Sequence, residues 1–233
     1  MTPGFIKELR HRSLAKIPVS AEAVFKNVYH SGFWGPGDDR FFSGSGSRCP
    51  EIVDPYIAAV TRALSSMGYQ PNVVDLGCGD FSVGSRIRPF CRGYIACDVV
   101  DALIQRNVAR FSKDEVEFRL LNIINDDLPK ADVAFVRQVF QHLSNRDIKK
   151  VLKKLVATYS RLIVTEQVPA GEFVPNLDHR TGADIRVNMP RPSGVVLTEP
   201  PFNLAAKQDI VLCEIPRDYA GRKAVIKTNL YKL

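Results

Sequence analysis

The stretch VVDLGCGDFSVG, at residues 73–84, is an apolar run that ends at an acid and two closely spaced glycines. A β-branched run of this length followed by a glycine turn is typical of a buried strand that leads into a helix. Comparable apolar runs recur at 94–97, 116–121, 132–136 and 161–165, with longer stretches of helical spacing between them. This alternation predicts an α/β, Rossmann-like fold with a mostly parallel sheet and helices on both faces.

The rest of the chain completes this expected sheet and adds a segment before it. The final runs at 210–215 and 224–230 are joined by a loop, which predicts a hairpin, seven strands in all and an antiparallel last strand. A short helix is expected near 21–30, and residues 1–48 are expected to form a cap or lid on a domain at 49–233. The helices of that domain are expected at 53–67, 83–90, 101–111 and 146–159.

The composition limits the classes of protein to consider. The 233 residues are 45% apolar and 24% charged, which suits a folded chain with one sizeable core. The chain start lacks the apolar core of a signal peptide, and no apolar run approaches the length of a membrane span, so we expect a cytoplasmic location. The five cysteines have neither CxxC nor zinc spacing, and we expect no metal site. A formal net charge of +7 suits an anionic partner, such as nucleic acid, a nucleotide-linked sugar or a membrane face.

The glycine turn can be tested against its possible ligands. A dinucleotide fingerprint needs a third glycine where Ser82 stands, and the Gly-Lys-Ser/Thr ending of a P-loop is absent. Asp75 would place a carboxylate close to a pyrophosphate, where like charges repel. The same acid suits a cationic ligand, and Gly77 and Gly79 let the backbone approach it closely. S-adenosylmethionine, with an ammonium, a sulfonium and no phosphate, fits this combination.

Two further strand ends carry polar residues suited to a nucleoside. Asp98 ends the second predicted strand about 20 residues past the glycines, where a carboxylate can accept both ribose hydroxyls, although NAD sites use the same feature. Asn122 follows the third strand and offers an amide for an adenine edge, or it is a plain polar loop residue. Ile123 offers an apolar contact for the ring.

Together these segments resemble the class I S-adenosylmethionine-dependent methyltransferases over roughly residues 50–233. VVDLGCGDFSVG resembles the glycine-rich first motif of that family, YIACDVV the acidic second, LLNI the third and ADVAFVRQVFQHLS the fourth. Phe81 departs from the family pattern at a frequent third glycine, and Asn122 replaces a commoner aspartate. The resemblance implies cofactor contacts from Asp75, Gly77, Cys78, Gly79, Asp98, Val99, Asn122, Ile123, Arg137 and Gln138.

A narrower resemblance is to a bacterial subgroup with WG and SGxGS segments before the first motif and PPFNL before the last strands. Here these read FWGPGDDRFFSGSGS and EPPFNLAAKQDIVL. The likeness implies O-methylation of a small polar or sugar-containing acceptor. The SGSGS segment is either a lid over the cofactor or a linker. Trp34 is either a wall of the acceptor site or a local packing anchor.

Three residues are candidates for the base that removes a proton from the acceptor. His142 follows the fourth strand and has an ordinary pKa near working pH, although a packing or helix-capping role fits it equally well. His179 and Glu166 are the other two, in the proline-rich stretch 167–203 and just before it. A stretch of that length without regular structure is typical of an active-site cover or substrate loop. The residues expected to bind the acceptor are Trp34, Asp178 and Arg186.

Two other functions stay open from the sequence. Base N-methylation is disfavoured because RQVF stands where such enzymes carry [DN]PP[YF], but an RNA ribose or ring-carbon target is not excluded. No separate RNA-binding module is recognisable, so nucleic acid is the less favoured partner. The fold could also bind the cofactor as a non-catalytic interaction protein.

Overall fold

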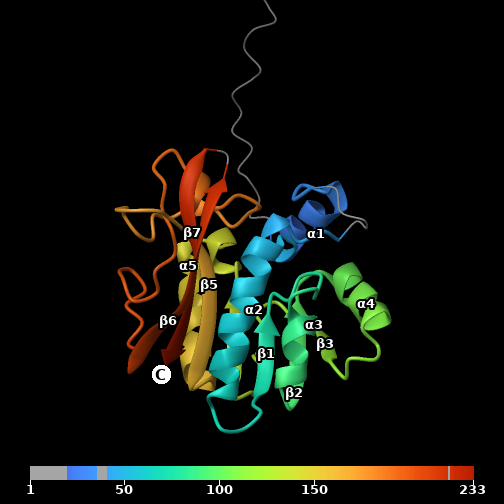
Figure 1. Cartoon of the computed structure of the whole chain (residues 1–233). Coiled ribbons are helices and arrows are strands. Elements are labelled where there is room, and N and C mark those ends of the chain that lie inside the picture. Colours follow the sequence, from blue (N-terminus) through green and yellow to red (C-terminus); the bar gives the residue numbers. More distant parts are fainter. Residues whose placement is uncertain (1–19, 36–40, 220) are drawn as a thin grey trace, which may run out of the picture.

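A computed structural model describes residues 20–35, 41–219 and 221–233. Strands and helices alternate through most of it, as the sequence predicts (Figure 1). The helices are α1 (Ala21–Ser31), α2 (Pro50–Ser65), α3 (Gly84–Ile87), α4 (Asp101–Arg110) and α5 (Asn145–Thr158). The strands are β1 (Asn72–Leu76), β2 (Gly93–Asp98), β3 (Glu117–Leu120), β4 (Val133–Arg137), β5 (Arg161–Pro169), β6 (Gln208–Tyr219) and β7 (Arg222–Lys232).

The seven strands form one sheet in the order β3-β2-β1-β4-β5-β7-β6. The strands β1 to β5 pair in parallel, whereas β7 is antiparallel to both of its neighbours, β5 and β6. The reversal of strand order beside β1 creates the crevice in which sheets of this type bind ligands. The predicted Rossmann-like α/β fold is confirmed.

Each face of the sheet is buried against its own layer. On one face, α2 and α3 pack their apolar sides on β1, β2 and β4, with Val60 and Phe135 at the centre. On the other face, α5 and the segment 195–206 cover the sheet around Val136 and Leu155. Figure 1 shows α2 and α3 in front of the sheet and α5 behind it.

The helix α5 is explained by its sequence. Ser144 caps its N-terminus by accepting the amide of Asp147, and Ile148, Val151 and Leu155 repeat at helical spacing on the buried side. The lysines between them lie on the exposed side. The helix therefore presents an apolar stripe to the sheet and a basic face to solvent.

The last two strands are longer than predicted. Strand β6 continues through Pro216 to Tyr219, so the hairpin turn is shorter than the expected loop at 216–223. Proline is tolerated there because β6 is an edge strand and its outward side needs no backbone donor. Within the described part of the chain, no helix is long and apolar enough to cross a membrane.

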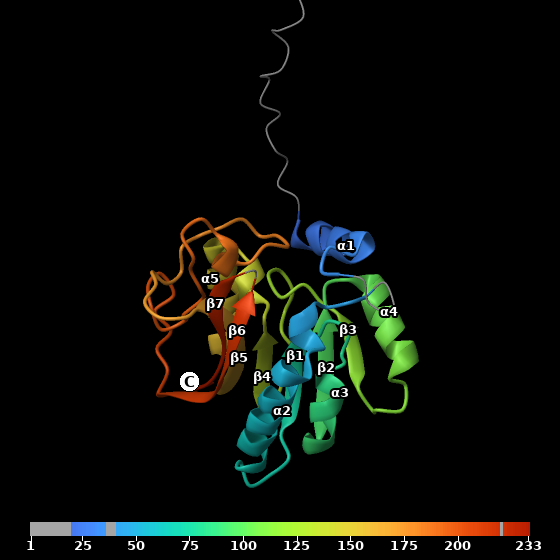
Figure 2. The ribbon, with the colours of Figure 1, turned by 45° about the horizontal axis from the view of Figure 1, so that its top comes forward.

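The first described helix lies apart from the sheet. It begins at the Ser20 cap and ends at Gly32, whose left-handed backbone stops the helix. Figures 1 and 2 both show α1 above the carboxyl-terminal edge of the parallel strands. Part of the predicted 1–48 cap, namely residues 1–19 and 36–40, lies outside the described residues.

Candidate functional site

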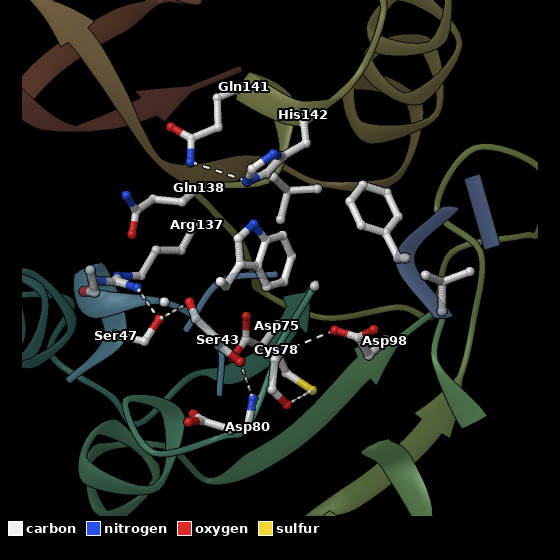
Figure 3. Close-up of a pocket in the computed structure, with 18 of the residues that line it drawn as sticks. Ser43, Ser47, Asp75, Cys78, Asp80, Asp98, Arg137, Gln138, Gln141 and His142 are labelled. Atoms are coloured by element: carbon white, nitrogen blue, oxygen red, sulfur yellow. Dashed lines mark hydrogen bonds between the residues drawn. The ribbon is translucent and has the colours of Figure 1, made fainter. Parts of the chain in front are cut away.

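A cavity of about 330 Å³ opens at the carboxyl-terminal ends of β1, β2 and β4. Its size lies in the range of small-molecule sites. It is lined by the glycine turn after β1, the ends of β2 and β4, α1 with its following loop, and residues 183–188. Figure 3 shows side chains from these elements converging on one space. All ten residues expected to contact a cofactor line it.

The glycine turn is held against the end of β2. The amides of Gly77 and Cys78 both donate to the carbonyl of Cys97, at 2.8 and 2.9 Å. Gly77 has φ +90°, and a Cβ at this position would lie 2.4 Å from Cγ2 of Val139. Only glycine therefore fits at this point of the turn, and its backbone is exposed to the cavity.

Asp98 joins the glycine turn to the end of β2. One carboxylate oxygen accepts the amide of Gly79 at 3.0 Å and the other accepts the amide of Val100 at 3.1 Å. Figure 3 shows Asp98 beside the glycine turn. Burial raises the pKa of Asp98, and these two amides oppose the rise because they favour the ionised form. Each oxygen retains a lone pair for a further donor. A pair of ligand hydroxyls suits this carboxylate.

Asp75 lies deeper, beneath the turn. The hydroxyl of Tyr94 donates to its carboxylate at 3.0 Å. Burial raises the pKa of Asp75 to about 6, while Tyr94 and the nearby guanidinium of Arg137 act in the opposite direction. A buried carboxylate at the cavity wall favours a cationic ligand group.

Arg137 supplies positive charge at the end of β4. Its guanidinium lies 4.8 Å from the centre of the Tyr56 ring and donates to the carbonyl of Gly46 at 2.6 Å and to the hydroxyl of Ser47 at 3.3 Å. The cavity therefore holds carboxylates and a guanidinium close together. Such a pairing suits a zwitterionic group, such as the amino and carboxyl groups of an amino acid.

Phe81 shows how the departure from the third glycine is accommodated. Its backbone is left-handed, with φ +60°, in the region where glycine is usual. Its ring is fully buried and makes edge contacts with Tyr94, Phe111 and Phe118 at centroid distances of 5.0 to 5.5 Å. The aromatic packing offsets the backbone strain.

Residues 43–48 tie the segment before the domain to the glycine turn. The hydroxyl of Ser43 accepts the amide of Asp80 at 2.9 Å and shares a hydrogen bond with the hydroxyl of Tyr29. Arg48 pairs with the buried carboxylate of Asp80 at 3.0 Å. The SGSGS segment thus contacts the glycine turn directly, and through Gly46 it also contacts Arg137.

Aromatic rings form the opposite side of the cavity. The ring centroid of Trp34 lies 5.2 Å from that of Tyr29, 5.4 Å from that of His142 and 6.3 Å from that of Phe25. The Phe25 and His142 rings meet edge to face at 6.0 Å. These contacts bring α1, its following loop and the turn after β4 together around one space.

The ring of His142 is neutral and forms a hydrogen bond with the side chain of Gln141. Burial lowers the pKa of its ring to about 4. The side-chain carbonyl of Gln141 accepts the backbone amide of Gln167 at 3.3 Å, so its NH₂ group faces Nε2 of His142 at 3.3 Å (Figure 3). Nε2 must then accept, which assigns the ring proton to Nδ1. In this arrangement His142 is a hydrogen-bond donor, and its basic nitrogen is occupied.

Four residues expected at the site do not line the cavity. The carboxylate of Glu166 is buried behind it and accepts the amides of Phe140 and Gln141, at 2.9 and 2.8 Å. Arg186 is fully buried and donates to the carbonyls of Phe140, Leu143 and Leu177 and to the side chain of Asn145.

These contacts show what the four residues do instead. Glu166 and Arg186 hold the turn after β4, and Asp178 accepts the amide of Asn145 at the start of α5. His179 is half-buried and also lies outside the cavity lining. None of these four side chains lines the cavity, and the base roles of Glu166 and His179 and the substrate roles of Asp178 and Arg186 stay predictions.

Other lining residues escaped the sequence analysis. They are polar or aromatic residues that no motif singled out, and only the fold brings them together. A pattern could have indicated Phe25 and Tyr29, which are spaced four apart on one side of α1. The missed residues that line the cavity include Phe25, Tyr29, Ser43, Tyr56, Tyr94, Gln141, Gln167, Asp184 and Asn188.

The described residues contain no group of three or more His, Cys, Asp or Glu side chains arranged to hold a metal ion. The candidate site is thus defined by its carboxylates, its guanidinium, its amides and its aromatic rings.

Comparison with known proteins identifies the fold. No family model and no curated protein matches the chain. Among solved structures, the N-methyltransferase NodS from Bradyrhizobium japonicum WM9, in complex with S-adenosyl-l-homocysteine, is similar with a TM-score of 0.61 at 13% identity. The match covers 88% of this chain and 98% of NodS.

Two further structures share the architecture. Magnesium protoporphyrin IX methyltransferase (ChlM) from Synechocystis PCC 6803, with bound SAM, has a TM-score of 0.57 at 14% identity and covers 92% of this chain and 98% of its own. Human N-acetylserotonin methyltransferase, in complex with SAM, has a TM-score of 0.58 at 14% identity. This match covers 92% of this chain and 60% of the human protein. The chain has the fold of S-adenosylmethionine-dependent methyltransferases.

Proposed function

We propose that this chain is an S-adenosylmethionine-dependent methyltransferase that methylates an oxygen of a small polar or sugar-containing acceptor. The observation that carries the proposal is Asp98, whose carboxylate is fixed by two backbone amides and retains lone pairs toward the cavity. In this proposal those lone pairs accept the ribose hydroxyls. Asn122 and Ile123, at the same end of the cavity, contact the adenine.

The other charged groups suit the amino-acid portion of the cofactor. Asp75 is a buried anion for its ammonium, and Arg137 is a cation for its carboxylate. The backbone of Gly77 and Gly79 passes close to the ligand because neither residue has a side chain. This distribution of charge distinguishes the site from a pyrophosphate site, which needs donors and cations where Asp75 stands.

When bound, the cofactor supplies a methyl group on a sulfonium, an electrophilic carbon that an acceptor oxygen can attack as the carbon–sulfur bond breaks. The chain has to align that oxygen and exclude water. The aromatic rings of Phe25 and Trp34 suit the ring of a small acceptor. Residues 20–35 and 41–48 form the lid in this proposal, since Ser43 contacts the glycine turn and Gly46 contacts Arg137 at the end of β4.

The position of the base follows from the cavity lining. His142 cannot accept a proton while Gln141 occupies Nε2. Asp184 lines the acceptor side of the cavity and is exposed, so it is the carboxylate that receives the hydroxyl proton in this proposal.

Calorimetric titration tests the cofactor assignment. The purified protein is titrated with S-adenosylmethionine, with NAD and ATP as controls, at fixed moderate salt. Micromolar binding of S-adenosylmethionine alone is the expected result. A folded protein that binds none of the three, or binds NAD instead, contradicts the proposal.

A further inference from the structure

Residues that line the cavity carry buried polar atoms without hydrogen-bond partners in the described part of the protein. Among the described residues, four buried side-chain nitrogens have no hydrogen-bond partner: Arg137 Nε, His142 Nδ1, Gln167 Nε2 and His179 Nε2. The first three belong to residues that line this one cavity. An unpaired buried donor costs stability, so three around one space indicate that a ligand supplies the missing partners.

Two of these residues define the acceptor end. Gln167 is 3% exposed and His142 is 8% exposed, so both are almost completely withdrawn from water. The hydrogen bonds of Gln141 described above link them, because its carbonyl accepts from the backbone of Gln167 and its NH₂ group donates to the ring of His142. The free atoms of this pair are therefore the NH₂ group of Gln167 and the Nδ1–H of His142. Both are donors.

The surroundings of this pair select the kind of ligand atom. Phe25 and Trp34 contact the His142 ring, so a ring in the ligand can lie beside the two donors. The backbone of residues 182–184 interacts with the His142 ring and opposes the fall in its pKa, but no backbone group there meets the geometry of a hydrogen bond to Nδ1. Asp184 adds a negative charge to the same side of the cavity. The guanidinium of Arg186, behind the turn, is already satisfied by four acceptors.

We infer that the acceptor places an uncharged oxygen, of a carbonyl or hydroxyl group, against Gln167 and His142. Its ring packs on the aromatic wall of Phe25 and Trp34. An ammonium group cannot accept from these donors, and a carboxylate would lose its hydration while facing Asp184. This inference rests on the proposed function, in which the opposite end of the cavity holds the cofactor, and it narrows the class of acceptor.

Stability provides the first test, because it needs no knowledge of the acceptor. Gln167→Met keeps a similar volume and removes a side-chain amide whose nitrogen has no hydrogen-bond partner among the described residues. The matched control is Thr165→Val, two residues earlier on β5, where the buried hydroxyl pairs with that of Thr228 at 3.0 Å. The control should lower the midpoint of thermal unfolding by about 2–4 °C. Gln167→Met should leave the midpoint unchanged or raise it, and a decrease as large as that of the control overturns the inference.

Ligand charge provides the second test. Benzamide, benzoate and benzylamine share a phenyl ring and differ in carrying a neutral, an anionic and a cationic group. They are titrated into the protein loaded with S-adenosylhomocysteine and followed by NMR. Benzamide should bind at least tenfold more tightly than the other two, and Gln167→Met should abolish this preference. Equal or tighter binding of benzoate or benzylamine, no binding of benzamide, or an unchanged preference in the variant overturns the inference.

The same preparation separates the two proposals. S-adenosylhomocysteine is titrated first into the wild-type protein. If the folded protein does not bind it, the proposed function fails, and the three probes are then titrated into the free protein, where the same benzamide preference is expected. If it binds and benzamide is not preferred, the oxygen subsite alone is wrong.

Discussion

The carboxylate of Asp98 accepts the amide of Gly79 at 3.0 Å, so the end of β2 fixes the glycine turn that follows β1. The same carboxylate accepts the amide of Val100 and borders the cavity. Two strands that are adjacent in the sheet are thereby joined at the point where a ligand enters. This single side chain shapes the turn and offers acceptors to the ligand.

Asp98→Ala is expected to raise the dissociation constant for S-adenosylmethionine at least tenfold, because it removes the acceptors for two ligand hydroxyls. Calorimetric titration measures the change. Asp101→Ala, at the start of α4, is the matched control, since its carboxylate accepts from exposed Gln105 and does not line the cavity. Equal affinities of Asp98→Ala and the wild type would contradict the ribose assignment.

Cofactor affinity is expected to depend on pH through Asp75. Its pKa is raised to about 6, so the carboxylate that binds the ammonium is protonated below that pH. Affinity should fall up to tenfold per pH unit below 6 and stay level above it. Tyr94→Phe removes a hydrogen bond that lowers the pKa, so it should move the midpoint upward. Asp75→Asn should bind weakly at every pH, and an unchanged pH dependence in this variant assigns the effect to another group.

The stability of the free protein should show the opposite dependence on pH. The pKa of Asp75 is higher in the folded state than its ordinary value of 3.8, so the folded protein holds the proton more tightly. Raising the pH from about 4 to about 6 therefore removes stability, up to about 3 kcal/mol from this group. Urea unfolding of the wild type and of Asp75→Asn across this range measures the free energy of unfolding against pH. If the two proteins show the same pH dependence, the contribution assigned to Asp75 is refuted.

Gly77→Ala is expected to destabilise the fold by about 3 kcal/mol, because it combines a left-handed backbone with a clash against Val139. Gly68 provides the control. It is also left-handed, at φ +75°, but a Cβ there meets nothing within 4 Å. Gly68→Ala should therefore cost only about 1 kcal/mol. Denaturant unfolding measures both, and similar losses would mean that Val139 moves aside.

Arg48→Met is expected to weaken cofactor binding about tenfold, because it leaves the buried carboxylate of Asp80 without its cation and loosens residues 43–48 over the turn. Arg86→Met is the control, since Arg86 makes an exposed ion pair with Asp54 and should have little effect. Titration of both variants with S-adenosylmethionine decides the point. Wild-type affinity in Arg48→Met would separate this ion pair from the cofactor site.

The repeated part of the architecture was predictable from sequence, whereas several local features were not. Short apolar runs that alternate with helical stretches predict the parallel strands. A strand that is buried on both faces of a sheet is a continuous apolar run in the sequence. The sequence predicts strand β6 only over 210–215, whereas the strand continues past Pro216, because at the edge of the sheet a proline does not remove a needed backbone donor. Phe81 adopts a backbone conformation that its residue type disfavours, which depends on the three rings around it.

Some residues of the candidate site were likewise predictable from the sequence, and others were not. The residues expected from the glycine turn and the strand ends reach the cavity because parallel strands end at one edge. Glu166 and Arg186 could not be told apart from site residues, since a buried charge held by backbone groups has the same sequence appearance as a reactive one. Gln141 lies in the fourth motif segment but was not singled out, Gln167 lies in no motif, and their proximity depends on the pairing of distant segments.

The contacts of α1 and residues 43–48 also set an order of assembly. Phe25 packs on His142, and Gly46 accepts from Arg137, 91 residues further along the chain. During synthesis α1 and residues 43–48 therefore emerge from the ribosome well before these partners, and they can make these contacts only after β4 has formed. Segments that precede the sheet in the chain thus complete the ligand site after the sheet has folded.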